Sequence, residues 1–173
     1  MKYLIAGLGS IGRRHLRNLR ALGQKDIILY RTNQATLPDE ELSGLPVFTE
    51  LRLALAEKPD GVIVSNPTAL HLEVALAAAE AGAALLIEKP VSNSLAGFDQ
   101  LQSTLAQSGK PAKLGFQFSF HPVLNQVKTL LKSGQLVKPL SARAHWDEYL
   151  PGWHTWEDYR RSYAARADLG GGV

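Results

Sequence analysis

The most informative stretch of this chain is Tyr3-Leu4-Ile5-Ala6-Gly7-Leu8-Gly9-Ser10-Ile11-Gly12. A short apolar run leads directly into the pattern G-x-G-x-x-G, and a helical pattern follows it. In such a strand–turn–helix unit, the first glycine makes the tight turn, the second lets the backbone approach a pyrophosphate, and the third lets helix and strand pack closely. Unpaired N–H groups at the start of the helix then stabilise the phosphates. We therefore predict that a dinucleotide binds at Gly7, Gly9, Ser10, Ile11 and Gly12; the alternative is a glycine-rich turn with no ligand.

Downstream of this unit, short apolar runs alternate with helical patterns as far as residue 117. The expected strands lie at 2–6, 27–30, 47–48, 61–65, 84–88 and 113–117. Most are continuously apolar rather than alternating, which is typical of parallel strands buried on both faces. The expected helices cover 11–22, a segment capped by Thr49, 69–81 capped by Thr68, and a segment capped by Ser94 that ends before Gly109. Repeated strand–helix alternation predicts an α/β fold, a Rossmann doubly wound parallel sheet.

The pattern changes after residue 117, and it predicts a helix over 122–133 and a half-exposed strand over 140–149. We therefore expect an NAD(P)-binding Rossmann domain over 1–120 and an incomplete α+β second domain over 121–173. A region this short rarely supports a core of its own. A strand with no partner also exposes its backbone groups, so we expect association into a homo-oligomer or disorder of the tail. The glycine run Gly170-Gly171-Gly172 resembles the entry to a further element.

Composition narrows the function classes. Hydrophobic residues make up 45% and charged residues 20% of the 173 residues, the balance of a globular protein. No run approaches the roughly 18–20 apolar residues of a membrane span, and the N-terminus lacks a signal-peptide pattern, so we expect a cytoplasmic protein without membrane contact. The chain has no cysteine, which excludes disulfides, a thiolate nucleophile and cysteine-ligated zinc.

The net charge of +3 is spread along the chain rather than gathered in a patch. One helix carries Arg13, Arg14, Arg17 and Arg20. Arg13, Arg17 and Arg20 share one side of it, which we interpret as a solvated helix face. The alternative is attraction of an anionic cofactor. Nucleic acid is not expected as a partner.

The second expected strand ends at Tyr30-Arg31-Thr32, with Arg31 nineteen positions after Gly12. An acidic residue near this place accepts hydrogen bonds from the adenosine ribose and favours NAD. Arginine instead pairs with a 2′-phosphate and stacks on adenine, and Thr32 adds a neutral donor. We therefore predict NADP or NAD as the cofactor, with NADP favoured. The alternative is that Arg31 is a solvated loop residue and either cofactor binds.

Two further motifs follow expected strands. Asn66-Pro67-Thr68 follows the fourth strand, and Glu88-Lys89-Pro90 follows the fifth, both at the sheet edge where ligands bind in open α/β folds. With the opening loop, the order and spacing of Gly-x-Gly-Ser-Ile-Gly-Arg-Arg-His, Asn-Pro-Thr-x-x-His and Glu-Lys-Pro-Val resemble the Gfo/Idh/MocA family of NAD(P)-dependent oxidoreductases. Members act mainly on sugars, nucleotide sugars and inositols.

The resemblance implies a role for each matching residue. It makes Lys89 the catalytic lysine, because an ammonium group can hydrogen-bond the substrate oxygen and relay its proton. Glu88 would contact the nicotinamide ribose, and Gln117 is a further candidate contact. Asn66, Pro67 and Thr68 would line the nicotinamide end, with His71 in the next helical turn. The alternatives are a surface lysine at Lys89 and a packing histidine at His71; at His15 we favour the packing interpretation.

The last part of the chain also fits the family, in the subgroups linked to acidic sugars. It gathers aromatic and basic groups that can stack on sugar faces or pair with anions, or that can pack an interface: Trp146, Tyr149, Trp153, His154, Trp156, Tyr159, Arg160, Arg161 and Tyr163. Members continue past the glycine run with a helix carrying an Asp and a His, which this sequence does not include. We therefore predict hydride transfer between nicotinamide and a secondary alcohol of a sugar-type substrate. The alternative is a dinucleotide-binding module without turnover.

Overall fold

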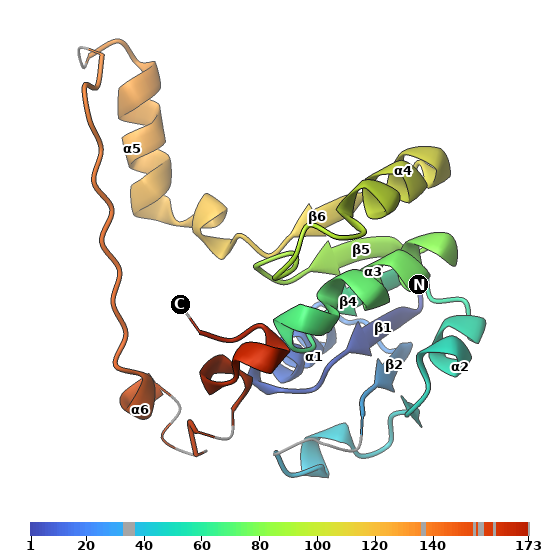
Figure 1. Ribbon diagram of the computed structural model, residues 1–173. Helices are drawn as coiled ribbons and strands as arrows, with labels where there is room; N and C mark the ends of the chain where they lie inside the picture. Colours follow the sequence, from blue (N-terminus) through green and yellow to red (C-terminus); the bar gives the residue numbers. More distant parts are fainter. Residues whose placement is uncertain (33–36, 136–137, 154, 156–157, 161, 173) are drawn as a thin grey trace.

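The computed structural model describes residues 1–32, 37–135, 138–153, 155, 158–160 and 162–172, and its centre is one parallel sheet (Figure 1). The six strands are arranged in the order β3-β2-β1-β4-β5-β6. They are β1 (Tyr3–Ala6), β2 (Ile27–Tyr30), β3 (Val47–Phe48), β4 (Gly61–Val64), β5 (Ala84–Ile87) and β6 (Ala112–Leu114). This is the strand order of the doubly wound dinucleotide-binding sheet, so the predicted fold class is confirmed.

The sheet is buried at its centre because β1 lies between two strands of similar length. Tyr3 is in register with Ile27 of β2 on one side and with Gly61 of β4 on the other. Leu4 and Ile5 of β1 are fully buried, on opposite faces of the sheet. The predicted continuous burial therefore holds for the central strands.

Burial fails at β6, where the prediction of a buried strand over 113–117 is wrong. Ala112–Leu114 is exposed because, among the described strands, it pairs with β5 alone at the sheet edge. The strand also ends early: Gly115 still donates to the carbonyl of Ile87 (2.8 Å), but Gln117 already opens a 3-10 turn.

Helices cover both faces of the sheet. Their bounds are α1 (Ser10–Ala21), α2 (Leu51–Ala56), α3 (His71–Glu80), α4 (Phe98–Ser108), α5 (Pro122–Lys132) and α6 (Leu150–Trp153). The 3-10 turns are η1 (Glu40–Leu42), η2 (Thr68–Leu70), η3 (Gln117–Phe120), η4 (Tyr163–Ala165) and η5 (Ala167–Leu169). Residues of α2, α3 and α4 pack on one face around Leu4, and α1 packs on the other around Ile5 together with Leu42 of η1. The sheet is therefore a two-sided core, as its apolar strands require.

The predicted helix ends are partly corrected. Glu50 rather than Thr49 precedes α2, and Thr68 lies buried in η2 instead of capping α3. Gly97 precedes α4 in the left-handed conformation, while the Ser94 hydroxyl accepts only the N–H of Ala96 (3.1 Å). Gly109 ends α4 as predicted, with φ +62°.

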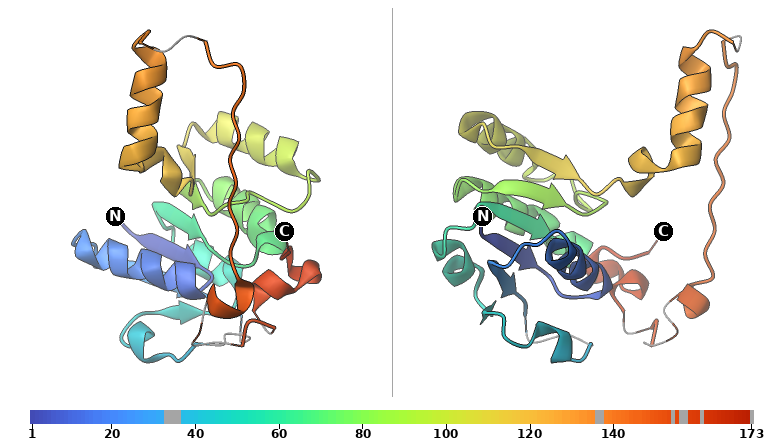
Figure 2. Two further views of the ribbon diagram at one scale, coloured as in Figure 1. Left: turned by 90° about the vertical axis from the view of Figure 1, so that its left-hand side faces the viewer. Right: turned by 180° about the vertical axis from the view of Figure 1, so that it is seen from behind.

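Beyond β6 the chain leaves the sheet. Figures 1 and 2 show α5 and the extended segment 138–149 reaching away from the other elements. The strand predicted over 140–149 is wrong: these residues form no ladder, because no described strand lies beside them to exchange hydrogen bonds. Both faces of the alternating pattern are therefore exposed. Leu140, on its apolar face, is 97% exposed.

The chain then returns to the sheet. Residues 162–172 pack through η5 against η2, at the carboxyl ends of the strands (Figure 1). Within the described part of the chain, no helix is long and apolar enough to cross a membrane, and no three acidic or histidine side chains form a metal-binding group.

Candidate cofactor-binding and active site

The glycine loop between β1 and α1 has the close contacts that its pattern predicts. Gly7 has φ +95°, and a side chain there would collide with the backbone of Asn66. A Cβ on Gly12 would collide with the carbonyl oxygen of Gly7. The Ser65 hydroxyl donates to this same oxygen (2.9 Å) and fixes the turn. These two positions therefore require glycine for reasons within the protein itself.

Gly9 differs, because nothing described lies within 4 Å of a Cβ built there. It precedes α1 in the extended conformation, and no described side chain caps the helix. The first N–H groups of a helix have no partner within it, and here they belong to a helix that begins at Ser10 and Ile11. The open space at Gly9 and the uncapped helix start fit a bound pyrophosphate.

The Asn66 loop lies at the same edge of the sheet. His71 is 2% exposed, and its Nδ1 and Nε2 lie 2.8 Å from the carbonyl oxygen of Pro90 and 2.7 Å from that of Asn66. It thereby links the loop after β4 to the loop after β5. The Asn66 amide nitrogen donates to the carbonyl of Leu70 (3.1 Å), whereas its Oδ1 is buried without a partner among the described residues. That oxygen fits a donor supplied by a ligand.

Glu88 and Lys89 follow β5, with a cis bond between Lys89 and Pro90. Glu88 Oε1 lies 2.7 Å from His15 Nε2, and both side chains are largely buried. Burial raises the pKa of Glu88, but the hydrogen bond and charge of His15 and the backbone N–H of Lys89 outweigh burial, so the net pKa lies below its ordinary value. The site thus holds an ionised carboxylate beside the exposed Lys89.

His15 contacts Glu88 at the candidate site, a contact that the sequence alone does not predict. The available signal was its place three residues after Gly12, which puts it on the same side of α1 as the glycine loop. Only the folded sheet edge shows that Glu88, far along the chain, is its partner.

Arg31 directly follows β2, and its guanidinium is engaged by another side chain. Its Nη1 and Nη2 donate to the two carboxylate oxygens of Asp39, each at 2.5 Å.

The expectation that Arg13 belongs to a solvated helix face is wrong. Arg13 is 6% exposed, and it donates to the carbonyl oxygens of Leu8 (3.1 Å) and Leu37 (3.2 Å). The cause is the loop before η1, which covers this side of α1.

The C-terminal segment lies over the same edge. A Cβ on Gly170 would come within 3.0 Å of the Thr68 side chain and 3.3 Å of that of Asn93. Burial and then the charge of Glu88 raise the pKa of Tyr163. Trp146 and Tyr149 are not gathered here, because both are exposed on the extended segment. His154, Trp156 and Arg161 lie outside the described residues.

Two predicted contacts and one hollow complete the description. Thr32 and Gln117 are exposed, and neither makes a described side-chain hydrogen bond.

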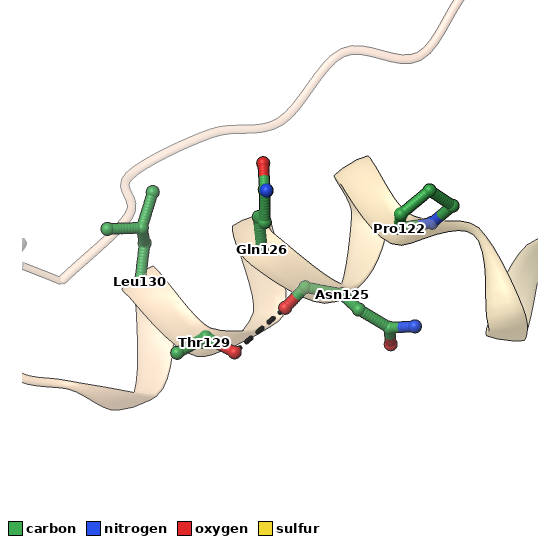
Figure 3. A pocket seen from close by; sticks show the side chains of 5 residues that line it. All are labelled: Pro122, Asn125, Gln126, Thr129 and Leu130. Atoms are coloured by element: carbon green, nitrogen blue, oxygen red, sulfur yellow. Dashed lines mark hydrogen bonds between the residues drawn. The ribbon is translucent and has the colours of Figure 1, made fainter.

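A hollow on α5 is lined by Pro122, Asn125, Gln126, Thr129 and Leu130 (Figure 3). None of these five side chains is ionisable, and α5 stands apart from the sheet edge, so the hollow carries none of the predicted chemistry.

Comparisons with known proteins agree with this geometry. A family model for Gfo/Idh/MocA proteins, described as an oxidoreductase family with an NAD-binding Rossmann fold, matches residues 1–116. Inositol 2-dehydrogenase of Streptomyces avermitilis is 31% identical over 79% of this chain and 41% of its own length. For scyllo-inositol 2-dehydrogenase (NAD(+)) of Bacillus subtilis, identity is 29% over the same shares.

The fold also resembles the WlbA dehydrogenase of Bordetella pertussis, solved with NADH and UDP-GlcNAcA. The TM-score is 0.69 and the identity 23%, over 77% of this chain and 42% of that one. The chain thus spans about two fifths of the length of the relatives it matches. The match over 1–116 covers the glycine loop, the Asn66 loop and Glu88-Lys89-Pro90. The chain therefore belongs to the Gfo/Idh/MocA oxidoreductase family and carries its NAD-binding Rossmann fold.

Proposed function

We propose that this chain is the nucleotide-binding part of an NAD(P)-dependent oxidoreductase that transfers a hydride between nicotinamide and a secondary alcohol of a sugar or sugar derivative. The observation that supports it best is the convergence of three loops at one sheet edge. The space at Gly9, the unpartnered Oδ1 of Asn66, and Lys89 beside the ionised Glu88 all lie there. The names of the inositol dehydrogenases among its relatives support the substrate class.

Different residues along this sheet edge bind different parts of the cofactor. Gly7, Gly9 and Gly12, with the N-terminus of α1 at Ser10 and Ile11, hold the pyrophosphate. Asn66, Pro67 and Thr68 line the nicotinamide end, where the unpartnered oxygen of Asn66 accepts a ligand donor. His71 holds this loop against Pro90 rather than touching the ligand, because its ring is buried between two carbonyl groups.

When bound, a nicotinamide cofactor supplies the site that gives or takes the hydride. Lys89 donates a hydrogen bond to the substrate oxygen and stabilises the negative charge that develops there when the hydroxyl group loses its proton or, in the reverse direction, when hydride adds to the carbonyl carbon. It also holds the proton that this oxygen loses or regains. Glu88, fixed by His15, keeps a negative charge next to Lys89 and faces the nicotinamide ribose.

The choice between NADP and NAD rests on Arg31. The Arg31 guanidinium favours the 2′-phosphate of NADP only when it has no other partner, and here it pairs with Asp39.

Residues 121–173 begin a second domain that contributes to the substrate site and to association between copies. The partner is a small sugar-type molecule, and the compartment is the cytoplasm.

The test begins with fluorescence titration of the protein with NADH and NADPH, followed by a sugar- and inositol-oxidation screen with the protein that carries the complete second domain. Lys89→Ala is expected to lower turnover about 10²- to 10⁴-fold, the usual contribution of a positioned acid–base group, with cofactor affinity unchanged within about twofold. Lys113→Ala, at an exposed lysine of β6, is the matched control. Failure to bind either nucleotide would overturn the proposal, and an unchanged rate in Lys89→Ala would remove the catalytic role of Lys89.

A further inference from the structure

The chain after β2 places the carboxylate of Asp39 beside Arg31, at the carboxyl end of β2. In dinucleotide-binding folds, an acidic residue about 20 positions after the glycine loop accepts hydrogen bonds from the adenosine ribose. That position is Arg31 in this chain, at the carboxyl end of β2. Asp39, eight residues further on, returns to the same place, and its two oxygens accept from the two terminal nitrogens of Arg31.

Contacts with α1 hold residues 37–42 in position. Arg13 is buried and donates to the carbonyl of Leu37 (3.2 Å), and it lies 3.8 Å from a carboxylate oxygen of Asp39. Arg17 pairs with Glu41 (3.0 Å), and Leu42 is buried in the core on the α1 side of the sheet. The carboxylate of Asp39 is therefore placed by the fold rather than by a chance surface contact.

We propose that Asp39 is the cofactor-specificity residue: it engages Arg31, presents its carboxylate to the adenosine ribose, and makes the chain prefer NAD(H) over NADP(H). The inference rests on the proposed dinucleotide binding. The Asp39 side chain is 55% exposed, so it can still accept from ribose hydroxyl groups while it pairs with Arg31. A 2′-phosphate has to displace Asp39 from Arg31 and also meets its negative charge.

The experiment measures dissociation constants for NADH and NADPH by fluorescence titration in the wild-type chain and in Asp39→Asn, with Asp39→Ser as a second variant. Each variant removes the repulsion and frees Arg31 to form charge-assisted hydrogen bonds, so we expect NADPH to bind about 10- to 100-fold tighter. NADH affinity should fall a few fold, because the carboxylate that accepts from the ribose hydroxyl groups is lost. Glu40→Gln removes an equal charge one residue away at an exposed position and is the control for overall charge.

The Arg31→Ala/Asp39→Asn double variant completes the test, because the gain in NADPH affinity requires Arg31 and should disappear in it. The inference is overturned if wild-type binds NADPH more tightly than NADH, if Glu40→Gln reproduces the gain, or if NADPH affinity in both Asp39 variants stays at the wild-type value. Wild-type chain that binds neither nucleotide contradicts the proposed function itself. Wild-type binding of NADH with no switch in the variants contradicts only the role of Asp39.

Discussion

The pair between His15 and Glu88 predicts a measurable loss of stability when either side chain is removed. The atoms His15 Nε2 and Glu88 Oε1 are 2.7 Å apart, and the two side chains are 16% and 17% exposed. An exposed ion pair contributes about 0–1 kcal/mol, whereas a hydrogen bond to a charged group contributes about 1.5–3 kcal/mol. Because solvent screens this pair only weakly, the larger range applies, and we expect His15→Ala to destabilise the protein by about 2 kcal/mol.

The remaining contacts of Glu88 support this magnitude. Without His15, its carboxylate keeps a distant backbone donor, the N–H of Lys89 at 3.4 Å. At about 2–4 °C of melting temperature per kcal/mol for a chain of this size, His15→Ala should melt about 4–8 °C lower at pH 7. Arg14→Ala removes an exposed side chain from the same helix and should stay within about 0.5 kcal/mol of wild type.

The assay is a double-mutant cycle of His15→Ala and Glu88→Gln followed by thermal unfolding. A coupling energy of about 1–2 kcal/mol is expected at pH 7. The pKa of Glu88 is lowered in the folded protein, so its stabilisation is complete above its ordinary value near 4.5 and is lost as the pH falls through the folded value. The destabilisation by His15→Ala should therefore shrink at low pH. A coupling below about 0.3 kcal/mol at pH 7 would refute the reasoning.

Two further predictions concern the other loops of the site. Gly9→Ala should leave the melting temperature unchanged, since nothing described lies within 4 Å of the added Cβ. It should weaken NADH binding more than tenfold, because the methyl group takes the space of the pyrophosphate. In Gly12→Ala the added Cβ collides with Gly7, so this variant should lose stability as well. His71→Ala removes the ring that lies between the carbonyls of Asn66 and Pro90 and opens a cavity, so urea unfolding should show a loss of about 2–4 kcal/mol. A value under about 0.5 kcal/mol would remove its linking role.

The sheet could be predicted from sequence because burial on both faces leaves a local signature. Each central strand, such as Gly61–Val64, is a short apolar run bounded by polar residues, and the alternation of such runs with helical patterns indicates a parallel sheet. The same signature misled at β6, because an apolar run does not show whether a second neighbouring strand exists. The alternation over 140–149 failed for a related reason: it describes two faces, but a strand also needs a partner for its backbone.

The candidate site was predictable as a set of residues but not as a set of contacts. Asn66 and Glu88 follow parallel strands, so their arrival at one edge follows from topology alone. The pairs between Arg31 and Asp39 and between His15 and Glu88 depend on how loops fold over α1, which no local pattern reports. Helical periodicity likewise put Arg13 with Arg17 on one face, yet only the loop at Leu37 decides that Arg13 is buried.

Helix α1 connects the two ends of the proposed cofactor groove. Arg13, in its first turn, holds the loop that carries Asp39, and His15, two residues later, holds Glu88. The helix is anchored in the core by Leu16, which follows His15 and is fully buried. Because one rigid helix positions both Asp39 and Glu88, a substitution that shifts α1 must disturb the adenosine end and the nicotinamide end together. Substitutions at Asp39 or Glu88 instead disturb one end each, so cofactor choice can change without altering the position of Lys89.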